Sequence, residues 1–254
     1  MSYTDYFNLP YYLSLISGVS EIIKVKDYKR YKKGLILRHD VDFSLELAYE
    51  LSKIEKAIGI VSTYYILTTS DIYNPFSVSS RRMLEDMIKD DMELGIHFDP
   101  AIYGIEMPDG ELIENLLREI QIFEMFLGRG FRVSSFSIHQ PSSFGRYVRT
   151  GKLIGAYDEE IFSNDKYISD TNFSFYGKDP AQWVRKSEEQ RIQLVIHPMQ
   201  YMIKEVGQYE EFLKRTMQAR YDKLDSYLYR NRLYRRQCGD YKDVTISVNR
   251  HDNE

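Results

Sequence analysis

The stretch GLILRHDVDFS, Gly34 to Ser44, runs from aliphatic residues straight into His39, Asp40 and Asp42. A strand that is buried in a core has no need of charge at its end. Side chains on a strand alternate between two faces, so Asp40 and Asp42 point the same way and His39 points the other way. Two carboxylates on one face repel each other unless a cation or a shared proton relieves them. The stretch therefore predicts a buried strand that ends at a divalent metal site.

On both sides of this strand, hydrophobic patterns typical of helices and of strands alternate along the chain. The predicted strands are 35–42, 60–67, 92–99, 131–139, 155–158, 166–170 and 192–197, and the predicted helices are 44–58, 81–89, 109–127 and 208–231. Strands that alternate with helices of this length are typical of βαβ units and a parallel sheet. No dinucleotide-binding or Walker glycine pattern follows any of the strands, which favours an α/β barrel over a nucleotide-binding sheet.

The composition favours one soluble globular domain. The chain has 254 residues, of which 43% are hydrophobic and 28% charged. One domain is predicted over 1–254, with a core at about 34–204 and a C-terminal helix at about 208–231. No run approaches the roughly 18 apolar residues of a membrane span, and no basic leader precedes the short apolar run near the N-terminus, so a cytoplasmic protein is expected. The net charge of −4 argues against nucleic acid as a partner.

Four of the five histidines follow an apolar strand at its carboxyl end, and they are His39, His97, His139 and His197. In a parallel barrel these ends share one face, where ligands bind. Imidazole and carboxylate suit zinc, iron(II) or cobalt, and three protein ligands leave a position open for water. The pattern therefore predicts a cluster with a chemical function. His39, on the opposite face of its strand, is expected to pack against a helix or to form a supporting hydrogen bond.

Five segments, in this order, resemble the motifs of the polysaccharide deacetylase superfamily (carbohydrate esterase family four), in a divergent branch with an HDVD first motif. They are RHDVD (38–42), LGIHFDP (94–100), SFSIHQPSS (135–143), YISDTNFSF (167–175) and LVIHP (194–198). The resemblance covers about Leu35 to Tyr201. It implies a distorted (β/α)7-type barrel and the hydrolysis of N-acetyl groups on sugars, or of related amides.

The same resemblance implies a role for each motif residue. Asp40 would be the catalytic base, His197 the general acid, and Asp170 the residue that tunes His197. Asp42 and His97 would bind the metal.

Two departures from the family pattern change the ligand set. Val41 separates the two aspartates of the first motif, which are usually adjacent, and Ala101 stands where a second metal-binding histidine is expected. His139 is therefore expected as the third ligand, with Asp99 as the alternative. The expected metal is zinc, with iron, cobalt or manganese as alternatives.

The sequence thus predicts a metal-dependent hydrolase that removes an N-acetyl or related acyl group from a sugar or glycan precursor. One alternative is a catalytically silent carbohydrate-binding or scaffold protein on the same fold, because the second motif is altered. Another is a metal-dependent phosphohydrolase, because DVDFS also resembles the nucleophile loop of haloacid dehalogenase-like phosphatases.

Two further interpretations stay open at this stage. Arg38 could interact with Asp40 or could simply be a cation at the strand end. A second set of residues could line a sugar groove or pack in the core, and these are Tyr64, Tyr65, Tyr103, Trp183 and Tyr201.

Overall fold

The computed structural model describes residues 6–128, 130–203 and 209–238. Contacts divide the chain into two compact units, Met1–Met202 and Ile203–Glu254. Of the described residues, the first unit contains every strand and every candidate site residue. Most of the C-terminal tail, including His251, lies outside the described residues.

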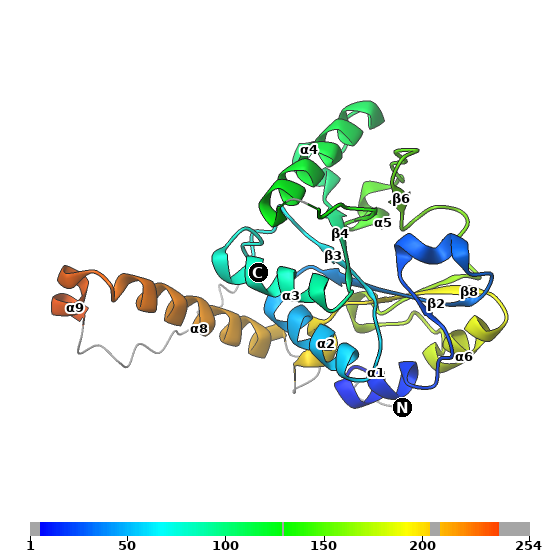
Figure 1. The fold of residues 1–254 in the computed structure, drawn as a ribbon, viewed down its shortest axis with the longest axis horizontal. Helices are drawn as coiled ribbons and strands as arrows, with labels where there is room; N and C mark the ends of the chain where they lie inside the picture. The colour runs from blue at the N-terminus through cyan, green and yellow to red at the C-terminus, as the bar shows by residue number, and fades with distance from the viewer. Residues whose placement is uncertain (1–5, 129, 204–208, 239–254) are drawn as a thin grey trace, which may run out of the picture. The chain divides into compact units, whose positions relative to one another are not determined.

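A parallel sheet of eight strands forms the centre of the first unit. The strands are β1 (Ile22–Ile23), β2 (Gly34–Val41), β3 (Thr63–Ile66), β4 (Glu93–Phe98), β5 (Ser135–Ile138), β6 (Ile154–Gly155), β7 (Tyr167–Ser169) and β8 (Arg191–Ile196). Their order is β6-β5-β4-β3-β2-β8-β7, and β1 pairs with the start of β2. The sheet curls into a half-barrel with helices along its outside, so the predicted distorted (β/α) barrel is confirmed (Figure 1).

The helices predicted at 44–58, 81–89 and 109–127 are present in the described part of the first unit, together with four α-helices that the sequence patterns do not predict. In the first unit they are α1 (Leu9–Ile16), α2 (Leu45–Ala57), α3 (Val78–Lys89), α4 (Asp109–Leu127), α5 (Pro141–Phe144), α6 (Pro180–Arg185) and α7 (Met199–Met202). Helix α3 begins before the predicted position because the Ser77 side chain accepts a hydrogen bond from the Ser80 amide (3.1 Å) and caps the helix there.

Other predicted boundaries also differ from the structure, since β3 begins at Thr63 and β5 at Ser135 where the patterns predict strands from 60 and 131. The strand predicted at 155–158 is β6 and ends at Gly155, because the Asp158 side chain accepts a hydrogen bond from the Gly155 amide (3.1 Å) and the chain turns. The helix predicted at 208–231 corresponds to α8 (Tyr209–Leu228) of the second unit, and a further helix, α9 (Arg232–Cys238), begins beyond the predicted range. None of the helices in the described ranges is long and apolar enough to cross a membrane.

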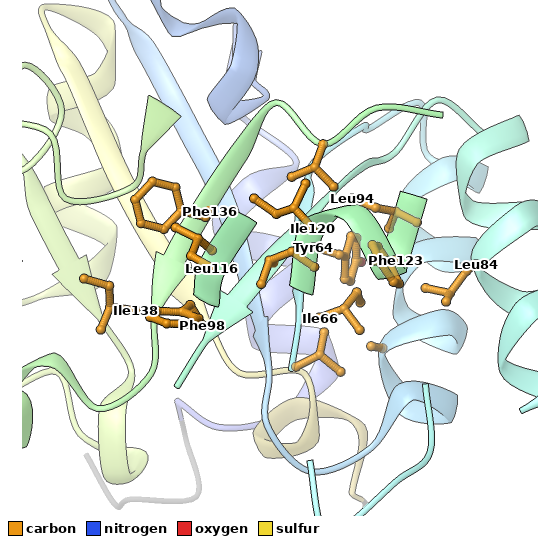
Figure 2. Close-up of a cluster of buried hydrophobic side chains, with 14 of the residues drawn as sticks. Tyr64, Ile66, Leu84, Leu94, Phe98, Leu116, Ile120, Phe123, Phe136 and Ile138 are labelled. Carbon is orange, nitrogen blue, oxygen red and sulfur yellow. The ribbon is translucent and has the colours of Figure 1, made fainter. Parts of the chain in front are cut away.

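The two faces of the sheet differ in polarity. On the outer face, apolar side chains of β3, β4 and β5 pack against α3 and α4 in one buried cluster (Figure 2). On the inner face the same strands carry Tyr65 and six small or polar residues, which are Thr63, Glu93, Gly95, His97, Ser135 and Ser137. The outer face therefore supplies much of the hydrophobic stabilisation of the fold, Ile36 and Tyr65 belong to a smaller buried cluster on the inner side, and the polar inner residues can carry chemistry.

Gly95 makes room for an aromatic ring inside the half-barrel. A Cβ atom at this position would lie 2.4 Å from Cε1 of Tyr65 and 2.6 Å from the carbonyl oxygen of Ser135. The Tyr65 ring is fully buried and lies beneath the Arg38 guanidinium, 5.3 Å from its carbon, so it has little freedom to move away.

We expect Gly95→Ala to lower the free energy of unfolding by about 1–3 kcal/mol, the usual cost of overpacking. Each kcal/mol should appear as a fall of about 2–4 °C in melting temperature. Gly110→Ala is the matched control, because no atom lies within 4 Å of the added methyl group and the residue is helical. An equal melting temperature for Gly95→Ala and wild type would contradict the close packing of Tyr65.

Candidate metal centre

The carboxyl ends of four strands bring the candidate residues together. Asp42 directly follows β2, His139 follows β5 and His197 follows β8, while His97 is the next-to-last residue of β4. Because all these strands are parallel, their carboxyl ends lie at one edge of the sheet. The three residues predicted as metal ligands are among those that meet there.

One carboxylate and two imidazoles form a compact set of donors. One ligand atom from each of Asp42, His97 and His139 lies within 4.8 Å of the other two. Oδ1 of Asp42 is 3.1 Å from Nε2 of His97 and 3.6 Å from Nδ1 of His139. The two imidazole nitrogens are 3.1 Å apart. This set can hold one divalent cation.

The surroundings of these donors fit a cation. Nδ1 of His97 lies 2.5 Å from Oγ of Ser137, a hydrogen bond that orients the ring and leaves Nε2 to face the centre. Oδ1 of Asp42 is buried and has no hydrogen-bond partner among the described residues. Burial opposes ionisation of Asp42, but the adjacent imidazoles of His139 and His97 hold its pKa well below the usual range, so Asp42 is a carboxylate.

Asp99, the alternative third ligand, has a different role. Its Oδ1 accepts a hydrogen bond from the Ala101 amide (2.9 Å) and caps the short 3₁₀ helix η3 (Pro100–Tyr103). Among the described residues it does not belong to the set that can hold a metal. The geometry therefore favours His139 as the third ligand.

Asp40 lies beside the donor set and is fixed by Arg38. Nε and Nη2 of Arg38 donate to the two oxygens of Asp40, at 2.8 and 2.7 Å, and Oδ2 of Asp40 is 3.9 Å from Nε2 of His97. Both charged groups are buried, with Arg38 at 0% exposure and Asp40 at 4%. Burial opposes ionisation of Asp40, but the attraction of Arg38 lowers its pKa, so Asp40 is a carboxylate at neutral pH.

Arg38 is held in turn by two residues of the barrel interior. Its guanidinium donates to the hydroxyl of Tyr157 (2.9 Å) and to the amide oxygen of Gln193 (3.2 Å). With the bonds to Asp40, each of the three guanidinium nitrogens has a partner, as a fully buried guanidinium requires. Arg38 thus interacts with Asp40, the first of the two interpretations that the sequence left open.

His197 is paired with Asp170. Nδ1 of His197 lies 2.5 Å from Oδ1 of Asp170, and the other carboxylate oxygen accepts the backbone amide of His197 (2.9 Å). Nε2 of His197 points toward the centre, 3.7 Å from Oδ2 of Asp42. Burial opposes the charged imidazole, but the attraction of Asp170 outweighs it and raises the pKa of His197 to about 10.

His39 lies on the opposite face of β2, as predicted. Its Nε2 is 2.8 Å from Oε1 of Glu55 in α2, and its ring stacks on Tyr64 at 4.4 Å. Tyr12, Ser62 and Tyr64 also donate hydrogen bonds to Glu55. His39 therefore belongs to a buried network that joins the sheet to α2 and takes no part in the centre.

The aromatic residues considered for a sugar groove are mostly in the core. Four of them are buried, and these are Tyr64, Tyr65, Trp183 and Tyr201. Tyr103 is half-buried and donates to Glu119 (2.7 Å). For the four buried residues the structure shows core packing, the other alternative that the sequence left open.

Sequence reasoning missed the residues that support the site from within the half-barrel, notably Ser137, Tyr157 and Gln193. Ser135 and Ser137 alternate with Phe136 and Ile138 in β5, and this period of two could have indicated an inner polar face. Tyr157 lies in the segment 155–158 that is predicted as a strand, but the structure ends β6 at Gly155, so the period of two does not fix the direction of its side chain.

Neither a family model nor a curated protein sequence matches the chain. Several solved structures are similar to it. A CE4 esterase from Streptococcus mutans is 10% identical with a TM-score of 0.47, and the match covers 68% of this chain and 77% of that one. The chitin deacetylase from the fungal pathogen Colletotrichum lindemuthianum is 12% identical with a TM-score of 0.44, covering 79% and 87%. A CE4 family pseudoenzyme from Bacillus anthracis is 12% identical with a TM-score of 0.42, covering 76% of this chain and 62% of that one, so the chain spans less than two thirds of its length.

Proposed function

We propose that the protein is a metal-dependent hydrolase that removes an N-acetyl or related acyl group from a sugar or glycan precursor. The observation that carries this proposal is the convergence of Asp42, His97 and His139 beside Asp40 and His197 at one edge of the half-barrel. The five motif segments described above support the same assignment.

Asp42, His97 and His139 would hold one divalent cation, and zinc is the metal we propose. When bound, such a cation polarises the carbonyl group of an amide and lowers the pKa of water from about 15.7 to about 7. Neutral imidazoles and a carboxylate are the ligands that zinc takes in catalytic sites with three protein ligands.

Asp40 would act as the general base. Because the neighbouring guanidinium lowers its pKa, it is ionised and able to accept a proton from the attacking water. Arg38 binds both of its oxygens and keeps the carboxylate directed at the centre.

His197 would act as the general acid. Its pKa, raised to about 10, keeps the imidazole protonated at neutral pH, and Nε2 faces the centre while Asp170 holds Nδ1. From this position His197 can donate a proton to the departing amine. An acid and a base with separated pKa values are what amide hydrolysis at neutral pH requires.

The geometry opposes the phosphohydrolase alternative. In that mechanism the first aspartate of DVDFS would attack phosphorus. The candidate donor set instead includes two imidazoles, whereas Mg²⁺ prefers oxygen ligands.

Metal analysis of the purified protein, combined with an acetate-release screen over N-acetylated sugars, tests the proposal. We expect about one divalent metal per chain and metal-dependent acetate release from at least one sugar. Metal binding and sugar binding without any release would favour the catalytically silent alternative. Absence of metal binding would contradict the proposal.

Replacing Asp170 by asparagine should lower the pKa of His197, because the anion that stabilises the imidazolium is removed while the burial remains. The acid must be protonated to work, so activity falls as pH rises through this pKa. We therefore expect the alkaline limb of the kcat/KM profile to move to lower pH in Asp170→Asn. Asp99→Asn changes the residue that caps η3, outside the donor set, and should leave the alkaline limb of the kcat/KM profile at its wild-type pH. An unchanged limb in Asp170→Asn would contradict the acid role of His197.

A further inference from the structure

We propose that Tyr73 is a positioning residue for the metal centre, and that its hydroxyl sets the place of Asp42 by bridging the ends of β2 and β3. Tyr73 lies in the loop between β3 and α3. Its hydroxyl donates to the carbonyl oxygen of Val41 (2.7 Å) and accepts from the amide of Leu67 (3.0 Å). This inference rests on the proposed metal-dependent function.

The Tyr73 hydroxyl lies where the backbone hydrogen bonds between the parallel strands β2 and β3 would otherwise continue. Val41 and Ile66 are the last paired residues of β2 and β3. In a continuing ladder the next bond would join the Val41 carbonyl to the Leu67 amide, since these bonds are evenly spaced along parallel strands. Tyr73 enters between the two groups and satisfies both, so the strands separate at this point.

The hydrogen bond from Tyr73 to Val41 lies next to the proposed metal ligand Asp42. Val41 is the residue between Asp40, the proposed base, and Asp42, the proposed ligand. A shift of its carbonyl turns the peptide plane that leads directly to Asp42. Groups that hydrogen-bond a metal ligand hold it in place, and their removal typically weakens metal binding by about 10- to 100-fold. Tyr73 would act one residue away, through the carbonyl of Val41.

Tyr73 is itself held firmly by its loop. The side-chain oxygen of Ser70 accepts hydrogen bonds from the amides of Ile72 (3.1 Å) and Tyr73 (3.3 Å). The groups that the hydroxyl bridges are shielded from water, with Val41 at 1% exposure and Leu67 at 8%. Without the Tyr73 hydroxyl, the Val41 carbonyl and the Leu67 amide either lose their hydrogen-bond partner or bond each other directly. We expect either change to shift the Val41 peptide and, with it, the position of Asp42.

The test is a titration of Zn²⁺ into metal-free wild type and Tyr73→Phe. We expect Tyr73→Phe to remain folded and to bind Zn²⁺ about 10- to 100-fold more weakly. Tyr49→Phe is the matched control, because it removes a hydroxyl that donates to Asp86 (3.4 Å) in the packing of α2 on α3, and its affinity should equal that of wild type. A purely structural role would lower the melting temperature of metal-free Tyr73→Phe without changing the affinity of the folded protein.

Equal Zn²⁺ affinity in wild type and Tyr73→Phe would overturn the inference and leave the proposed function intact. Failure of wild type to bind Zn²⁺ would overturn both. If Tyr73→Phe does not fold, Ser70→Ala decides the question, because it removes the turn that places Tyr73. This variant should weaken Zn²⁺ binding in the same direction by a smaller factor, and wild-type affinity in it would count against the role of Tyr73.

Discussion

Asp40→Asn is expected to lower the rate of acyl release by about 10²- to 10⁴-fold, the usual contribution of a positioned general base. The amide of asparagine cannot accept the proton that the carboxylate takes from water. Asp40 does not belong to the set of donors, so the variant should bind metal with the stoichiometry of wild type. Acetate release and metal content, measured on the same preparation, separate these two effects.

The variant has a second, structural effect that the experiment must allow for. It leaves Arg38 buried opposite a neutral side chain, and breaking a buried ion pair costs about 3–5 kcal/mol. Activities should therefore be compared at a temperature where both proteins are folded. Asp99→Asn is the matched control and should retain activity, because Asp99 caps η3 and lies outside the donor set found among the described residues. Full activity in Asp40→Asn would remove Asp40 as the base.

His97→Ala should lose both metal and activity. His97 is one of three donors, and its Nε2 lies near both other ligand atoms, 3.1 Å from Oδ1 of Asp42 and 3.1 Å from Nδ1 of His139. Removal of a ligand should weaken metal binding by more than the roughly 10- to 100-fold that loss of an outer partner costs. Zn²⁺ titration of the metal-free proteins measures the difference directly.

Ser137→Ala provides a graded comparison for His97→Ala. It keeps the imidazole but removes the hydrogen bond at Nδ1 that orients it. Its loss of affinity should therefore lie between wild type and His97→Ala. Metal retained at full occupancy in His97→Ala would contradict the ligand assignment.

The sequence predicts the site residues at the ends of the strands far better than the supporting residues inside the half-barrel. A strand that ends in charge has few explanations, and parallel strands place their carboxyl ends at one edge, so Asp42, His97, His139 and His197 could be placed together from spacing alone. His39 could be excluded by the period of two along β2. These arguments work because the backbone geometry of a strand fixes the direction of each side chain.

The supporting residues could not be predicted in the same way. Arg38 and Asp40 are neighbours on one face of β2, but the pairing of Arg38 with Tyr157 and Gln193 depends on segments more than a hundred residues away. Tyr73 lies in a loop, where no periodicity fixes the direction of a side chain. The two residues of β6 show a further limit, because a single hydrogen bond from Gly155 to Asp158 ends the strand.

The ion pair of Arg38 and Asp40 has a consequence for how this protein can change. Well-packed hydrocarbon side chains that replace a buried ion pair are often neutral or stabilising by about 1–4 kcal/mol. The surrounding half-barrel is closed off from water at this point, with Arg38 fully buried. Selection for thermal stability alone would thus favour hydrophobic residues at positions 38 and 40. Selection for the proposed activity would keep the two charges. The two kinds of selection would therefore oppose each other at this pair of positions.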